Sequence, residues 1–225
     1  MSNFFTSSLG KKLIMSLAGL FLCVFLVVHL GINLLLLSND KGEVFRVAVH
    51  FMTTNILIKI MEIFLFGGFL LHIIYGVIVQ IRNWMARPSG YAVSNNSQTS
   101  FFSKYMIHTG VIIFIFLAIH MANFYFVKLG ITTPLEGGSN PVQDTHDFYN
   151  MAINLFTTPA YSIFYLVCMI FLSFHLLHAF QSAFQTMGVN HPKYSPIIKW
   201  IGNIYAIVVP AGFAFIPVYF LFFYN

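Results

Sequence analysis

The chain has 225 residues, of which 58% are hydrophobic and only 8% are charged, and its mean hydropathy is +0.81. Soluble domains carry about 25% charged residues, so this composition excludes a soluble globular domain and indicates an integral membrane protein. The net charge of +5 comes from a few loop lysines and arginines, which suits membrane topology better than nucleic-acid binding. Cys23 and Cys168 each lie in an apolar run, so neither a disulfide framework nor a thiolate metal site is expected.

Five apolar stretches are long enough to cross a hydrocarbon core of about 30 Å, which takes roughly 20 helical residues. The first is too long, and continues too far without a small-residue cleavage site, to be a removable signal peptide. Segments rich in turn-forming residues separate the stretches. The sequence therefore predicts an all-α membrane protein with five transmembrane helices in one domain, residues 1–225. The helices are expected at about 13–37, 56–81, 105–127, 160–186 and 198–222.

The charged residues of the loops divide between the two sides of this expected topology. One side, which includes the amino terminus, has basic residues and no acid: Lys11, Lys12, Arg82, Arg87, Lys104, Lys193 and Lys199. The other side has few basic residues (Lys41, Arg46 and Lys128) and most of the acids: Asp40, Glu43, Glu136, Asp144 and Asp147. The positive-inside rule therefore places the amino terminus in the cytoplasm.

Four of the expected helices carry histidines inside the apolar region. Counting about 1.5 Å per residue from the cytoplasmic loops places His29 and His120 in the outer half, roughly 25 and 24 Å deep. His72 at roughly 15 Å, with His175 or His178 at roughly 20 and 15 Å, shares the inner half. A single intramembrane histidine can be an interhelical hydrogen-bond donor. Histidines that match at two depths are better interpreted as ligands than as hydrogen-bond donors, because unpaired ionisable groups are costly in hydrocarbon.

The number of histidines at each depth indicates what they bind. Zinc takes three or four protein ligands at one depth, often with an acid, and neither level offers that set. Haem iron takes two axial imidazoles from opposite sides of an apolar slot between helices. The sequence therefore favours two haems as cofactors. No Cys-x-x-Cys-His segment occurs, so they would be held without a covalent tether.

The first and third expected helices look like copies of one another. GLFLCVFLVVHLGIN (19–33) aligns with GVIIFIFLAIHMANF (110–124), so that each copy has a glycine ten residues before its histidine and an asparagine after it. The glycines, Gly19 and Gly110, mark either a place where a flat macrocycle presses on the backbone or ordinary helix packing.

The second and fourth expected helices share a shorter pattern. HIIYG (72–76) resembles HLLHA (175–179), with Tyr75 opposite His178. This alignment favours His175 as the ligand, although the depth count slightly favours His178. The two histidines share a helix face, so both are expected to lie near the cofactor.

Four motifs in order, MSLAGLFLCVFLVVHLGINLLL, KIMEIFLFGGFLLHIIYG, HTGVIIFIFLAIHMANF and FHLLHAFQSAFQTMG, resemble the five-helix dihaem cytochrome b subunit of succinate dehydrogenases and succinate:menaquinone or fumarate reductases. The resemblance implies that His29 and His120 ligate the iron of a distal haem b, and His72 and His175 that of a proximal one. It implies a non-catalytic electron-transfer subunit in a bacterial inner membrane. Its partners would be a flavoprotein (FAD) subunit and an iron–sulfur subunit on the cytoplasmic side. They would exchange electrons with a membrane quinone, menaquinone by this likeness.

Two features depart from the family pattern. The outer loop 128–159 is longer than expected, and Ser173 stands where some dihaem fumarate reductases carry a glutamate used for proton transfer. Near the outer end of the second helix, Glu62 either forms an interfacial ion pair with Lys59, one turn earlier, or delivers protons to a quinone. The remaining histidines are interpreted first as surface or loop residues: His50, His108, His146 and His191.

Two alternative functions stay open on the sequence alone. A haem-free transporter or proton channel would use the histidines directly, but would be expected to carry more acids within its helices. A cytochrome b subunit of another respiratory complex would have the same haem chemistry and different partners.

Overall fold

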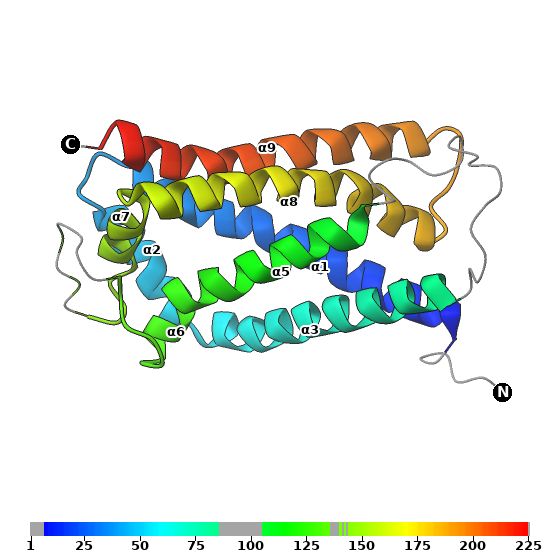
Figure 1. Ribbon diagram of the computed structural model, residues 1–225, viewed down its shortest axis with the longest axis horizontal. Helices are drawn as coiled ribbons and strands as arrows, with labels where there is room; N and C mark the ends of the chain where they lie inside the picture. Colours follow the sequence, from blue (N-terminus) through cyan, green and yellow to red (C-terminus); the bar gives the residue numbers. More distant parts are fainter. Residues whose placement is uncertain (1–6, 86–104, 136–139, 141, 143, 225) are drawn as a thin grey trace.

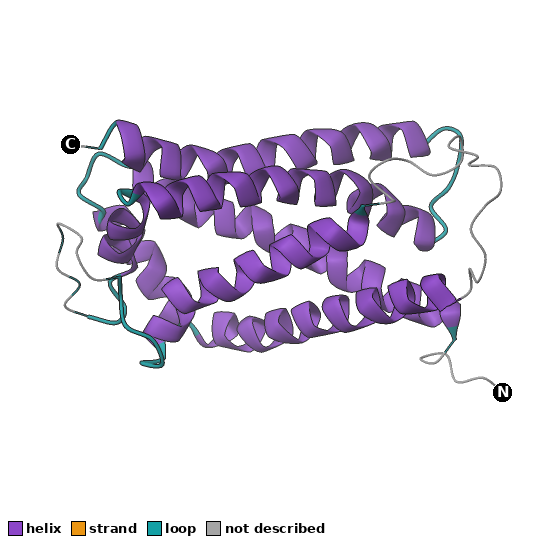
Figure 2. Ribbon diagram, in the orientation of Figure 1, coloured by secondary structure: helices purple, strands orange, loops and turns teal. Residues whose placement is uncertain are grey.

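The computed structural model describes residues 7–85, 105–135, 140, 142 and 144–224 (Figure 1). Over these residues the chain forms helices and no strand (Figure 2). The five long helices are α1 (Ser8–Leu34), α3 (Ile56–Met85), α5 (Met106–Asn123), α8 (Pro159–Thr186) and α9 (Ser195–Phe222). The short ones are the 3-10 turn η2 (Leu35–Leu37), α2 (Glu43–Thr54), α6 (Tyr125–Lys128) and α7 (Phe148–Phe156). This architecture confirms the predicted all-α class.

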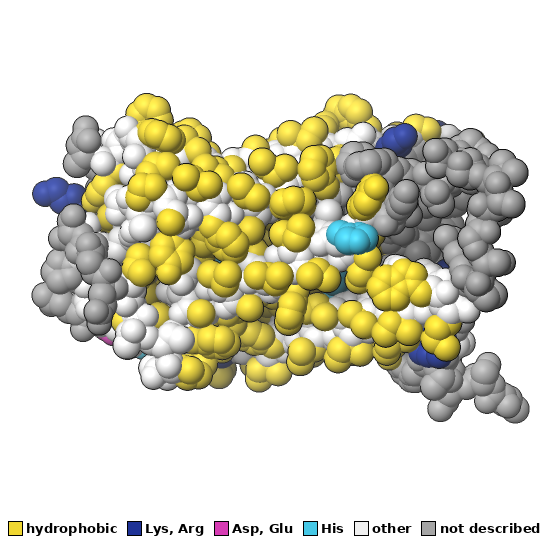
Figure 3. Space-filling model, in the orientation of Figure 1, with side chains coloured by type: hydrophobic (Ala, Val, Ile, Leu, Met, Phe, Trp, Pro, Cys, Tyr) yellow, Lys and Arg dark blue, Asp and Glu magenta, His cyan; other side chains and the backbone are white. Residues whose placement is uncertain are grey.

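Five candidate spans, long and apolar enough to cross a membrane, run along the long axis of the molecule (Figure 1). Their outward surfaces are apolar: Ile63 is 73% exposed and Leu70 is 61% exposed. Yellow apolar side chains cover the middle of the molecule, and Lys and Arg show only towards its two ends (Figure 3). Such a large apolar belt is stable in hydrocarbon and unfavourable in water. The chain is therefore a multi-pass membrane protein, with its spans close to the expected ranges.

Helices α1 and α8 form the centre of the bundle. Helix α1 packs against α3, α8 and α9, whereas α8 packs against α1, α5 and α9. The two central helices run antiparallel, with α3 and α5 beside them (Figure 1). Each central helix therefore faces one flanking helix that carries a histidine.

The two ends of the bundle differ in charge. The starts of α1, α5 and α9 lie together with the ends of α3 and α8 (Figure 1), and we call this the basic end. Its described charges are Lys11, Lys12, Arg82, Lys193 and Lys199. Arg87 and Lys104, expected on the same side, lie outside the described residues. The opposite end, which we call the acidic end, has these described charges: Asp40, Glu43, Glu62, Asp144 and Asp147 with Lys41, Arg46, Lys59 and Lys128. Glu136, expected on the same side, lies outside the described residues.

Helix α9 carries no histidine and packs closely on the two central helices. A Cβ atom at Gly202 would lie 2.8 Å from the ring of Phe180 on α8, and one at Gly212 would lie 2.8 Å from a methyl group of Leu30 on α1. The hydroxyl of Tyr205 donates a hydrogen bond of 2.7 Å to the main-chain carbonyl of Cys23. Small residues permit this approach, as is common between membrane helices.

Helices α2 and α7 cover the acidic end, and neither helix was predicted from the sequence. The segment 128–159, expected as a long loop, contains α7, whose residues Tyr149 and Met151–Phe156 are all buried. Nine residues are too few to cross a membrane, so the apolar segment closes the end of the bundle instead. The carboxylate of Asp147 accepts the Asn150 N–H and caps the helix start.

The turn before α2 is built on a left-handed glycine. Gly42 has φ +84°, and a Cβ atom there would overlap the ring of Tyr149. Before it, hydrogen bonds from the Ser38 hydroxyl and from the N–H groups of Val44 and Gly42 hold the pKa of the Asp40 carboxyl below its usual value. The turn therefore sets the position of α2 against α7.

An ion pair and a cation–π contact join α2 to α7. The Nε atom of Arg46 lies 3.5 Å from a carboxylate oxygen of Asp147, and its guanidinium carbon lies 4.6 Å from the Tyr149 ring centre. The planar guanidinium suits both contacts. This link orders the two helices that cover the acidic end.

Replacing Gly42 with alanine is expected to lower the free energy of unfolding by about 2–4 kcal/mol, because left-handed strain adds to overlap with Tyr149. Gly188→Ala is the matched control, since Gly188 has φ +82° and nothing within 4 Å of its Cβ position. That control should lose only about 1–2 kcal/mol. Denaturant unfolding in detergent measures both variants, and equal losses would contradict the role of the Tyr149 contact.

Candidate functional site

Histidines from four different helices meet in two pairs. His29 on α1 and His120 on α5 have ring centres 5.8 Å apart, with an angle of 85° between the ring planes. His72 on α3 and His175 on α8 have ring centres 6.4 Å apart, with an angle of 74°. We call them the acidic-end pair and the basic-end pair. The structure thus brings together His29 and His120, which the depth count matched, and His72 and His175, which the motif alignment favoured.

The two glycines of the internal repeat contact the histidines of the basic-end pair. A Cβ atom at Gly19 would lie 3.2 Å from Cε1 of His72, and one at Gly110 would lie 3.7 Å from Cε1 of His175. Each glycine stands ten residues before the acidic-end histidine of its own helix. The two pairs are therefore about 15 Å apart along the bundle. At each of these glycines, an imidazole of another helix lies against the backbone.

Hydrogen bonds fix the tautomers of the basic-end pair. Nδ1 of His72 lies 3.3 Å from the main-chain carbonyl oxygen of Met15, which can only accept, so this nitrogen carries the proton. Nδ1 of His175 lies 3.2 Å from the Thr109 hydroxyl. That hydroxyl donates its own proton to the Met106 carbonyl at 2.9 Å, which leaves its oxygen to accept from His175. In both histidines, Nε2 therefore keeps a free lone pair.

The acidic-end pair has different neighbours. Nδ1 of His120 lies 3.4 Å from the Tyr165 hydroxyl, which also accepts a 3.1 Å hydrogen bond from Nδ2 of Asn123. The amide nitrogen of Asn33 donates to the His29 carbonyl at 2.8 Å and lies 3.4 and 3.5 Å from the two ring nitrogens.

Phenylalanine rings surround the acidic-end pair. Phe25 stacks on His29 with ring centres 5.1 Å apart, and Phe116 stacks on His120 at 5.7 Å. These rings make the surroundings of the two imidazoles largely apolar.

The donor set fits a haem better than a bare metal ion. Among the described residues, no group of three or more His, Cys, Asp and Glu side chains could hold a metal. A porphyrin supplies four in-plane nitrogens and needs only two axial imidazoles from the protein. With metal–nitrogen bonds of about 2 Å on each side, the ring centres of such imidazoles lie roughly 6 Å apart. The observed separations of 5.8 and 6.4 Å agree with this spacing.

His178 stands one turn beyond His175 on α8 and is half-buried. Among the ring contacts of the described residues, His72 meets His175 and not His178. The depth count, which slightly favoured His178, ignores helix tilt. The motif alignment, which favoured His175, reflects which side chain faces the neighbouring helix. The remaining candidates lie apart from the pairs: His50 and His108 are exposed, and His146 and His191 lie in connections.

Glu62 pairs with a different lysine from the one expected. Its carboxylate lies 3.7 Å from Nζ of Lys128 on α6, and that ammonium group also lies 5.2 Å from the Tyr125 ring centre. Lys59, the expected partner, is exposed. Helix α6 brings Lys128 to α3 across the acidic end, a tertiary contact that local spacing did not indicate.

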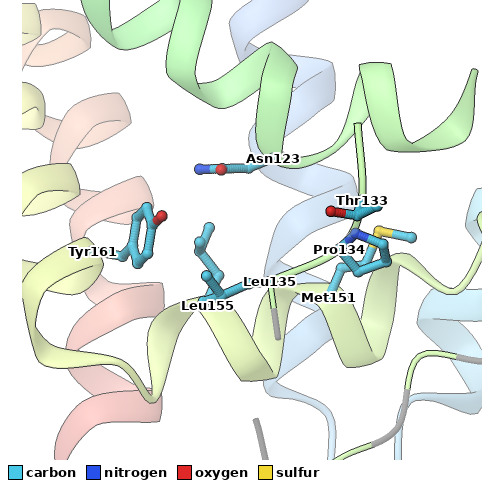
Figure 4. A pocket seen from close by; sticks show the side chains of 7 residues that line it. All are labelled: Asn123, Thr133, Pro134, Leu135, Met151, Leu155 and Tyr161. Carbon is cyan, nitrogen blue, oxygen red and sulfur yellow. The ribbon is translucent and has the colours of Figure 1, made fainter. Parts of the chain in front are cut away.

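A cavity of about 250 Å³ opens beside the acidic-end pair (Figure 4). It lies between the end of α5, the loop that follows α6, helix α7 and the first turn of α8. The amide of Asn123 and the hydroxyl of Tyr161 point towards one another across it (Figure 4). The lining residues are Asn123, Thr133, Pro134, Leu135, Met151, Leu155 and Tyr161.

Asn123 joins this cavity to the acidic-end pair, because the same side chain donates to Tyr165 beside His120. No local pattern in the sequence marks this cavity, although the internal repeat includes Asn123.

Comparison with known proteins gave no match: no family model, no curated protein and no solved structure is significantly similar to the chain.

The Glu62–Lys128 pair is expected to contribute about 1 kcal/mol, because both side chains are partly buried, at 27% and 19% exposed. Glu62→Gln and Lys128→Met should each lower the free energy of unfolding by that amount, and the double variant should lose little more than either alone. Lys59→Met serves as the control and should leave stability unchanged. Denaturant unfolding of the four variants measures this coupling, and additive losses would show that the two charges do not interact.

Proposed function

We propose that this chain is the membrane-anchor cytochrome b subunit of a succinate dehydrogenase or fumarate reductase complex. It relays electrons through two haems b between an iron–sulfur subunit and a membrane quinone. The observation that carries the proposal is the presence of two facing imidazole pairs, with hydrogen bonds that leave Nε2 free in the basic-end pair. The resemblance of four helices to that family supports it further.

The histidines would hold one haem at each level. His29 and His120 would be the axial ligands nearer the acidic end, and His72 and His175 those nearer the basic end. The iron, when bound, supplies one-electron exchange between the ferric and ferrous states. Held by one imidazole from each of two helices, the iron would have no open position for oxygen or a substrate. The chain is therefore an electron-transfer subunit without a catalytic residue of its own.

The chain's other residues position these ligands and set their surroundings. Met15 and Thr109 accept the Nδ1 protons, which orients the imidazoles of the basic-end pair and raises their basicity. Gly19 and Gly110 give those rings room against the neighbouring helices. Apolar rings around the acidic-end pair exclude water and lower the local dielectric.

The basic end is the side on which the soluble partners are proposed to bind. A cluster of basic residues and no acid among its described residues is typical of a cytoplasmic face. The amino terminus would then lie in the cytoplasm of a bacterial cell, with the flavoprotein and iron–sulfur subunits docked on this end. The acidic end would face the opposite side of the inner membrane.

The cavity at the acidic end is the proposed place for the quinone ring, menaquinone by the family likeness. Sites for small organic ligands combine apolar side chains with a few placed polar groups. Here the Asn123 amide and the Tyr161 hydroxyl lie opposite one another among Pro134, Met151 and Leu155 (Figure 4). They are suitably placed to donate hydrogen bonds to the carbonyl oxygens of a quinone.

The purified chain is expected to bind two haems, with a split α-band in its reduced spectrum. His175→Ala removes an axial ligand and should reduce the haem content by one, whereas His178→Ala should retain both haems. Pyridine haemochrome assays with quantified protein measure the ratio. An intact folded chain without colour would contradict the proposal and favour the haem-free transporter, while the co-purifying subunits would identify a different respiratory complex.

Tyr161→Phe is expected to raise the apparent KM for a quinone about five- to tenfold, since one neutral hydrogen bond contributes about 1 kcal/mol. The haem content should stay at the wild-type level, because Tyr161 contacts neither histidine pair. Steady-state reduction of a short-chain naphthoquinone by the whole complex measures the change. The conservative control is Tyr219→Phe, which removes a hydroxyl from α9 outside the cavity lining. An unchanged KM would place the quinone elsewhere.

A further inference from the structure

Tyr165 is buried, and both its ring and its hydroxyl group make specific contacts. The side chain is 5% exposed and stands on α8 between the rings of Phe116 and Phe156, with centre separations of 5.0 and 5.1 Å. Both rings meet it edge-on, at 82° and 80°. Its hydroxyl meets Nδ1 of His120 at 3.4 Å and accepts from Asn123 at 3.1 Å. Packing thus aims the phenol oxygen at one histidine.

Three of the four paired histidines have an Nδ1 partner on another helix. Met15 supplies a main-chain carbonyl to His72, Thr109 a hydroxyl to His175, and Tyr165 a phenol to His120. Of these three partners, Tyr165 is the one that is hydrogen-bonded to a residue lining the cavity, Asn123. The acidic-end pair therefore has a polar connection to the cavity.

We infer that Tyr165 is the positioning residue of His120. We infer also that Asn123 tunes the hydrogen bond between Tyr165 and His120 and links it to the cavity. This inference rests on the proposed function. With Nε2 of His120 on the iron, as proposed, its Nδ1 would carry the proton and donate it to the phenol oxygen, which also accepts an N–H from Asn123. Tyr165 would then hold the His120 ring in the orientation that ligation needs.

The two hydrogen bonds act on the iron in opposite directions. An acceptor at Nδ1–H makes the imidazole a stronger donor, which stabilises ferric iron and lowers the reduction potential. Donation from Asn123 withdraws charge from the phenol oxygen and weakens it as an acceptor for His120. Removing Tyr165's hydroxyl should therefore raise the potential of the acidic-end haem, and removing Asn123's amide should lower it.

A ligand in the cavity would act through the same link. A carbonyl oxygen that takes an N–H of Asn123 would draw the amide from the phenol and strengthen the bond from His120 to Tyr165. Quinone binding and reduction of the acidic-end haem are then thermodynamically coupled, and coupling of this kind is reciprocal.

The test is a spectroscopic redox titration of both haems in the intact complex. Tyr165→Phe should favour the reduced state of the acidic-end haem about three- to tenfold, where a tenfold change equals about 59 mV for one electron. Asn123→Leu should shift the same haem the other way. Thr109→Val is the matched control, because it removes the acceptor of His175 and should raise the potential of the basic-end haem only.

A purely structural role for Tyr165 predicts no such opposition of sign. Unchanged potentials in Tyr165→Phe, equal shifts of both haems, or shifts of the same sign in Tyr165→Phe and Asn123→Leu would each overturn the inference while leaving the two haems in place. If Tyr165→Phe loses the haem, fluorotyrosine at position 165 keeps the shape with a weaker acceptor oxygen, and the potential should rise by a smaller amount. An unchanged potential there would also overturn the inference. A wild-type chain without haem would instead end the proposed function.

Discussion

The pairing of imidazole nitrogens inside the hydrocarbon is the constraint on which the site depends. A polar nitrogen in a membrane interior is costly unless it has a partner. In the basic-end pair, Met15 and Thr109 satisfy the Nδ1 atoms of His72 and His175, and both Nε2 atoms are then acceptors. Two acceptors cannot satisfy one another, so the Nε2 lone pairs of these two neighbouring rings are left for another partner. An electron-pair acceptor such as haem iron is the chemistry that this arrangement suits.

Four of the long helices supply the paired histidines, and the fifth supplies packing contacts. Each histidine pair takes one member from a central helix, His29 from α1 or His175 from α8, and one from a flanking helix, His120 from α5 or His72 from α3. Helix α9 contributes none and holds the centre together through Gly202 and the other close contacts described above. The proposed ligation at two levels would therefore depend on the antiparallel order of the central helices more than on any single loop.

The sequence predicted what local spacing determines and missed what tertiary contacts determine. Hydropathy and the rise of 1.5 Å per residue predicted the spans and matched the histidine depths. The covering helix α7 has too few residues for a membrane signal, and its burial comes from the ends of other helices. Helical spacing indicated Lys59 as the partner of Glu62, but Lys128 on α6 forms the ion pair instead. The contact of Tyr165 with His120 joins positions 45 residues apart, and no periodic pattern reports it.

The two ends of the molecule are suited to different tasks. The acidic end is covered by α2 and α7, and a cavity of about 250 Å³ there is lined by apolar side chains together with polar groups, among them the hydrogen-bonded Asn123. The basic end has no comparable covering helices among the described elements, and its charges lie at the helix ends. The cavity is the proposed place for the quinone ring, and the basic end is the proposed docking face for the soluble partners. With the histidine pairs about 15 Å apart between them, electrons that enter at the basic end would leave through the pair beside the cavity.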